Sequence, residues 1–174
     1  DKELLSPVLT EIADKLADFG VPGISRAQGF RDKFRLSGQP ADGGKEGRAA
    51  AFERVRKTLL DKATDSQAWI DYGNLLWGEG KPLLAKIAYE RALLLDPKAA
   101  AALNNRGVLI VSGIGQEDWI RVAEGNQFFK DALRRDELFL AAKFNRGAIL
   151  NYYRIFSKAK PYWLQVSAVA PQAD

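Results

Sequence analysis

Side-chain amides recur in three similar stretches of this sequence. The stretches are IDYGNLLW (70–77), ALNNRGVL (102–109) and KFNRGAIL (143–150), and each carries an asparagine near a glycine: Asn74, Asn105 and Asn145. An amide side chain offers two hydrogen-bond donors and an acceptor, the groups that pair with a peptide backbone. A row of such amides can therefore bind a peptide whatever its side chains, provided that the fold brings the three stretches side by side.

The sequence lacks the residues that common catalytic and metal sites require. It has 174 residues without Cys or His, which excludes disulfides, thiolate metal sites and catalysis by a Cys or His group. The Gly-Lys stretches 43–47 and 78–82 lack the earlier glycine and the following Ser or Thr of a phosphate-binding loop. Spacing singles out no carboxylate pair or Ser-Lys dyad, so we expect no enzyme activity, no cofactor and no metal.

The composition is that of an ordinary soluble protein, with enough apolar residues, 47%, to bury a core. Its 26 Lys and Arg are interleaved with 22 Asp and Glu, which gives a net charge of +4. A nucleic-acid-binding protein more often concentrates its basic residues in one stripe, so we expect no nucleic-acid partner. No apolar run approaches the roughly 18 residues of a membrane helix, so we expect no membrane insertion.

The elements that position the amides are predicted to be helices. From about Lys45 onward, apolar residues follow helical spacing between recurrent turn signals, and no stretch has a convincing strand alternation. The first part of the chain, 1–62, is predicted to be an N-terminal helical segment. It contains helices over 1–19 and 25–36 and a Gly-rich loop over 37–47. The expected fold class is therefore all-α.

The glycines of the three similar stretches set an internal period. Gly73 and Gly107 are 34 residues apart, and Gly107 and Gly147 are 40 residues apart. A helix–turn–helix unit of 34 residues has the length of a tetratricopeptide repeat. Residues 66–99 match the small and large positions of that repeat on both helices, at Trp69, Tyr72, Gly73, Leu76, Ala85, Tyr89, Ala92 and Pro97.

Residues 66–173 therefore resemble three tetratricopeptide repeats. The units are 66–99, 100–139 with a six-residue insertion within 111–124, and 140–173, where Lys143 replaces a large aromatic residue. The resemblance implies a right-handed superhelical stack of helical hairpins, preceded here by the N-terminal segment. It also implies that the three glycines lie where the two helices of a hairpin cross closely.

In such a stack, the first helix of each unit lines a concave groove. Helical spacing then assigns an uncharged set of amide, aromatic and aliphatic residues to this face or its margin. The predicted partner-binding residues are Ile70, Asn74, Trp77, Asn104, Asn105, Val108, Phe144, Asn145, Asn151 and Tyr152. We expect the amides to bind a partner's backbone and the aromatic residues to receive its apolar side chains.

The resemblance implies a non-catalytic scaffold for protein–protein interaction, which holds a peptide or a partner helix in the groove. Recognition of an acidic C-terminal tail is disfavoured, because Ile70 and Ala141 occupy the slots of the lysines that grip a terminal carboxylate in some family members. The alternative is a structural assembly element that packs edge-on with itself or with further repeats.

The sequence identifies neither the partner nor the compartment. The absent initiator Met suggests a partial or processed chain. A bacterial cell-envelope complex is a hypothesis that starts from this observation, and periplasmic and cytoplasmic locations both stay open.

Two arginines and one tryptophan keep alternative interpretations. Arg106 and Arg146 stand beside the glycines and form either an anion site or a structural contact. In the structural contact, the stem packs and the guanidinium reaches an acid such as Glu90 or Asp131. Trp119, in the insertion, is either a second partner contact or packs over the second helix of its unit.

Overall fold

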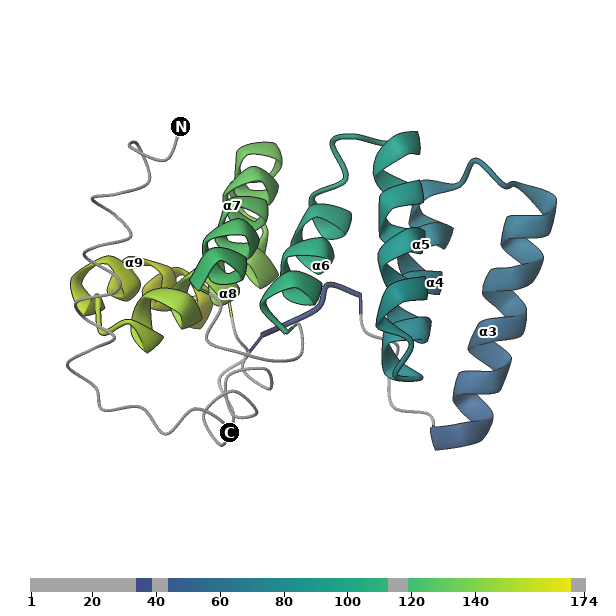
Figure 1. Cartoon of the computed structure of the whole chain (residues 1–174), viewed down its shortest axis with the longest axis horizontal. Helices are drawn as coiled ribbons and strands as arrows, with labels where there is room; N and C mark the ends of the chain where they lie inside the picture. The colour runs from purple at the N-terminus through teal and green to yellow at the C-terminus, as the bar shows by residue number, and fades with distance from the viewer. Residues whose placement is uncertain (1–33, 39–43, 113–118, 170–174) are drawn as a thin grey trace.

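A computed structural model describes residues 34–38, 44–112 and 119–169, and the regular secondary structure in these ranges is entirely α-helical (Figure 1). The expected all-α class is therefore confirmed. The helices are α3 (Gly44–Asp61), α4 (Ser66–Gly78), α5 (Pro82–Leu95), α6 (Ala100–Val111), α7 (Trp119–Arg135), α8 (Leu140–Tyr152) and α9 (Phe156–Ser167). Among these helices, none combines the length and apolarity of a membrane span.

The helices after α3 pack as three antiparallel hairpins, α4 with α5, α6 with α7 and α8 with α9. Each hairpin packs on the next through α5 with α6 and α7 with α8, and α3 covers α4 at one end of the row. Figure 1 shows the helices following one another along the long axis of the molecule from α3 to α9. The first helices of the hairpins begin at Ser66, Ala100 and Leu140, the residues at which the three predicted units begin.

Glycine is required where the two helices of a hairpin approach each other. A Cβ added to Gly107 of α6 would lie 2.6 Å from Cε1 of Phe129 and 3.0 Å from the backbone oxygen of Gly125, both on α7. At Gly73 of α4, the added Cβ would collide with the ring of Tyr89 on α5. The prediction that these glycines mark the helix crossings is confirmed.

The turns inside the first and third hairpins share one backbone conformation. Gly80 has φ +70°, and its N–H donates to the Trp77 carbonyl at 2.9 Å. Arg154, at the matching place between α8 and α9, has φ 56° and donates to the Asn151 carbonyl at 3.0 Å. This left-handed conformation is accessible to glycine at little cost but is strained for arginine.

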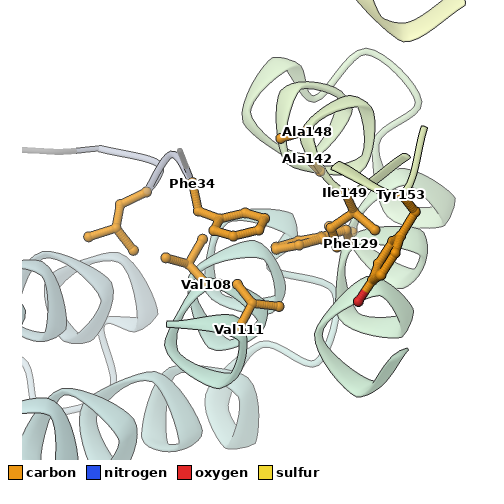
Figure 2. Packing of buried hydrophobic residues seen from close by; sticks show 10 residues of the cluster. Phe34, Val108, Val111, Phe129, Ala142, Ala148, Ile149 and Tyr153 are labelled. Carbon is orange, nitrogen blue, oxygen red and sulfur yellow. The ribbon is translucent and has the colours of Figure 1, made fainter. Parts of the chain in front are cut away.

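The largest buried cluster joins the second and third hairpins to a segment far away in the sequence. It contains residues of α6, α7 and α8 together with Phe34 and Leu36. Figure 2 shows the Phe34 ring pointing toward the Phe129 ring of α7, with Val108 and Val111 of α6 beside it. Residues 34–38 are therefore part of the packed structure and not a surface appendage.

The N-terminal predictions need correction where the structure describes them. Residues 34–36 are not helical, although a helix was predicted over 25–36, and α3 already begins at Gly44, inside the predicted loop 37–47. The helix predicted over 1–19 lies outside the described residues. In the second hairpin, α7 has 17 residues against the 14 of α5, so the insertion partly lengthens α7.

Candidate functional site

The backbone of residues 35–38 is bound by asparagines from the first helix of each hairpin. Asn145 of α8 bonds to Arg35, Asn105 of α6 bonds to Ser37, and Asn74 of α4 bonds to Ser37 and Gly38. Figure 1 shows the segment, in dark blue, passing α6 between α8 and α4. The segment therefore runs against the order of the hairpins, from the third to the first.

Two of these asparagines pair with both backbone groups of one residue. The Asn145 Oδ1 atom accepts the Arg35 N–H at 2.7 Å, and its Nδ2 atom donates to the Arg35 carbonyl at 2.9 Å. Asn105 pairs with Ser37 in the same way, at 2.7 and 3.1 Å. In an extended chain, the N–H and C=O of alternate residues point toward the same edge. One amide of α8 and one of α6 therefore bind the backbone of two residues that are two positions apart.

Further donors complete the contact. The Nδ2 atom of Asn104 donates to the Arg35 carbonyl at 3.0 Å, and that of Asn74 donates to the carbonyls of Ser37 and Gly38, each at 2.9 Å. We refer to Asn74, Asn104, Asn105 and Asn145 as the amide row. The amide row makes seven hydrogen bonds to this backbone, five as donor and two as acceptor.

The amide row is also linked internally. Asn145 donates to Asn104 at 2.8 Å, Asn104 to Asn105 at 3.1 Å, and Asn105 to Asn74 at 2.8 Å. Each Nδ2 therefore donates twice, and no amide hydrogen of the row is left without an acceptor. This satisfaction explains how Asn104, Asn105 and Asn145 tolerate an exposure of 0%.

Tyr89 of α5 also hydrogen-bonds to the amide row. Its hydroxyl donates to the Oδ1 atom of Asn74 at 2.7 Å. Burial raises the pKa of Tyr89 well above its ordinary value. The hydroxyl therefore keeps its proton and remains a donor, which leaves both amide hydrogens of Asn74 to bind the carbonyls of Ser37 and Gly38.

The side chains of the bound segment alternate between buried and exposed. Phe34 and Leu36 are 7% and 9% exposed, whereas Arg35 between them is exposed. The Phe34 ring stacks on Phe129 with centroids 6.1 Å apart and an interplanar angle of 21°. The Arg35 guanidinium lies over the Phe144 ring, 5.3 Å from its centroid. This alternation is that of an extended chain with one face on an apolar core.

Gly38 ends the described segment in a conformation that favours glycine. Its φ is +71°, and an added Cβ would lie 3.4 Å from Nδ2 of Asn74 and 4.0 Å from a carboxylate oxygen of Asp71. Asp71, the other residue near Gly38, is half-buried, and this burial raises the pKa of its carboxyl group. A side chain at position 38 would therefore be strained by the backbone conformation, and its Cβ would make only ordinary contact with the amide row.

The structure brings together six of the predicted partner-binding residues. The four amides form one row, Val108 belongs to the cluster that contains Phe34, and Phe144 contacts Arg35. Helical spacing predicted that the amides form a face available to a partner. The structure differs, because the chain's own residues 34–38 cover them. Whether any of these residues binds a partner stays a prediction.

The remaining four predicted residues lie elsewhere. Ile70 is 2% exposed and belongs to the buried cluster of α4, α5 and α6, so the structure places it in the core and not at the amide row. Trp77 is half-buried between two clusters. Tyr152 is half-buried and its ring is 5.3 Å from that of Tyr153, and Asn151 is exposed.

The two arginines beside the glycines make structural contacts. Arg106 forms an ion pair with Glu90 at 2.8 Å and lies 5.7 Å from the Phe128 ring, which confirms the predicted contact with that acid. The Arg146 guanidinium lies 4.9 Å from the centroid of Tyr162. Asp131, the other predicted acid, pairs with Arg134. Trp119 begins α7, and its side chain lies outside the described part of the chain.

Phe34, Arg35 and Leu36 are the site residues that sequence reasoning missed. Their signal was an apolar–basic–apolar alternation, FRL, followed directly by Ser-Gly, which is typical of a short extended segment before a turn. Within the described residues, no group of three or more acidic side chains is placed to hold a metal ion.

In comparisons with known proteins, the chain matches no family model, and no curated protein matches it.

Proposed function

We propose that this chain is a non-catalytic peptide-binding scaffold, in which a right-handed superhelical stack of three tetratricopeptide-like hairpins presents a concave groove. The groove is the face of α4, α6 and α8 that carries the amide row. The observation that supports this proposal is the pairing of asparagines from all three hairpins with the backbone of residues 35–38. Backbone pairing does not depend on the ligand's side chains, so a partner peptide can be held in the same way.

The repeat interpretation is supported by two regularities. The first helices begin at the expected residues 66, 100 and 140. In addition, the three glycines face aromatic residues of the second helix in each hairpin, at Tyr89, Phe129 and Trp163. Three hairpins with one repeated crossing give three first helices in succession, which is what a continuous row of amides requires.

Peptide binding is tested with a variant of the 174-residue chain in which Phe34→Ala and Leu36→Ala weaken the binding of the chain's own segment. A fluorescein-labelled peptide that copies residues 32–39 is titrated into it, and anisotropy is measured. We expect saturable binding that is lost on adding Asn105→Leu. The matched control is Gln165→Leu, which replaces an exposed side-chain amide of α9 and should leave binding unchanged. Equal binding by the Asn105→Leu and Gln165→Leu variants would contradict the proposal.

A second candidate function, assembly through the second helices, is supported by one observation. Leu83, Ile87 and Leu94 of α5 are each more than half exposed, and their spacing places them on one helical face. Self-association through this face predicts that Ile87→Glu reduces the sedimentation coefficient of the protein. The control is Leu164→Glu, which changes an exposed residue of α9. A wild-type protein that sediments as a monomer would exclude this candidate.

A further inference from the structure

We infer that residues 34–38 are a resident competitor of the groove, and that their order of side chains specifies its partner. The partner is another protein's extended segment in which an aromatic, a basic and an aliphatic residue follow one another, with a glycine two positions after the aliphatic residue. This inference rests on the proposed function and states which peptides the groove selects and how their access is controlled.

The amide row fixes the register in which a peptide binds. Asn145 and Asn105 bind the backbone of two residues that are two positions apart, Arg35 and Ser37. The side chains of the residues that precede each of them, Phe34 and Leu36, then fall on the buried face. A peptide that satisfies the same backbone bonds therefore presents its first and third side chains to the core and its second outward.

Each presented position has its own chemical preference. The first faces the Phe129 ring, which favours an aromatic side chain. The second lies over Phe144, whose ring attracts a cation and disfavours a carboxylate. The third is as buried as Leu36, which favours an aliphatic residue. The fifth has the left-handed conformation of Gly38, which favours glycine.

The resident segment lowers the apparent affinity for any such partner. It is tied to α3 by only five residues, 39–43, and a short linker gives an effective concentration on the order of 1 mM. If the free groove binds the motif with a dissociation constant on the order of 10 μM, its own segment occupies it about 99% of the time. A partner's apparent affinity then falls about 100-fold. Weakening the binding of the resident segment should therefore raise the partner's apparent affinity by up to the same factor.

The test compares wild type with the Phe34→Ala and Leu36→Ala variant in the anisotropy titration with the 32–39 peptide. We expect the variant to bind at least 10-fold more tightly than wild type. A second peptide with Glu in place of Arg35 should bind the variant several-fold more weakly than the parent peptide. Circular dichroism checks that the variant keeps its helices. If it does not, Ser37→Pro replaces it, because proline removes the N–H that Asn105 accepts and leaves both apolar side chains in place.

The outcomes separate the inference from the proposed function. Equal affinities of wild type and variant, with binding still abolished by Asn105→Leu, would overturn the competition and leave peptide binding intact. Equal affinities for the Arg and Glu peptides would overturn the inferred side-chain order. No binding by a folded variant, or binding insensitive to Asn105→Leu, would overturn both the inference and the proposed function.

Discussion

Asn105→Leu removes the central member of the amide row without a large change in side-chain volume. Asn105 makes four hydrogen bonds, two with Ser37 and one each with Asn74 and Asn104. After the substitution, the Ser37 carbonyl keeps its bond from Asn74, and Oδ1 of Asn74 keeps its bond from Tyr89. The Ser37 N–H and one amide hydrogen of Asn104 lose their acceptors.

Those two orphaned donors set the size of the effect. A buried donor without a partner costs about 1–3 kcal/mol, so two such donors should lower the free energy of unfolding by about 2–6 kcal/mol. Because a domain is typically stable by only about 5–15 kcal/mol, the loss is easily measured. Urea unfolding followed by circular dichroism supplies the number. Asn151→Leu, at an exposed position of α8, should change stability by less than about 0.5 kcal/mol.

A double-mutant cycle locates the loss in the bound segment. Ser37→Pro removes the N–H that the Asn105 Oδ1 atom accepts, so each single variant breaks the same bond. We expect the double variant to be less destabilised than the sum of the two, with a coupling of about 1–2 kcal/mol. Additive losses, or a loss below about 1 kcal/mol for Asn105→Leu alone, would refute the reasoning.

Three further predictions concern packing, turn geometry and pH. Gly107→Ala should destabilise the protein by about 1–3 kcal/mol, because the added methyl group would collide with α7. Its control is Gly47→Ala, where the methyl group meets open space in α3, and this variant should be more stable by up to about 1 kcal/mol. Equal melting temperatures of the two variants would contradict the close crossing. Gly80→Ala should cost about 1 kcal/mol through backbone strain alone, while Gly78→Ala, with equal space but no positive φ, should cost nothing in the same urea assay. Burial raises the pKa of Tyr153 above its ordinary 10.0. As the pH rises, the unfolded chain therefore loses the Tyr153 proton before the folded protein does. The contribution of Tyr153 to the free energy of unfolding is complete below pH 10 and falls above it by up to about 1.4 kcal/mol per pH unit. Tyr153→Phe should make that decline shallower, and an unchanged slope would contradict the burial of the hydroxyl.

Local patterns were sufficient to predict the helical hairpins and the glycines at their crossings. The interval between Gly73 and Gly107 predicted the hairpin length, and a side chain at either glycine would collide with the facing helix. These features depend on residues close together in sequence, or on a spacing that repeats, so they are visible without coordinates.

The cover over the amide row could not be predicted in this way. Arg35 and Asn145 are 110 residues apart, and no periodicity links a five-residue segment to a helix at that distance. Helical spacing suggested a helix over 25–36, but the amides offered residues 34–38 an alternative set of backbone bonds, and tertiary contacts outweigh local preference. Ile70 was misplaced for a related reason, because spacing identifies the faces of α4 but not which neighbouring helix covers each face.

The most direct test of the central claim is hydrogen exchange of the Arg35 and Ser37 backbone amides, followed by nuclear magnetic resonance. If Asn145 and Asn105 hold these two N–H groups, each should exchange on the order of 100-fold or more slowly than in an unstructured chain. Asn105→Leu should accelerate the exchange of the Ser37 amide more than that of the Arg35 amide. Exchange of both amides at the unstructured rate in the wild-type protein would contradict the account.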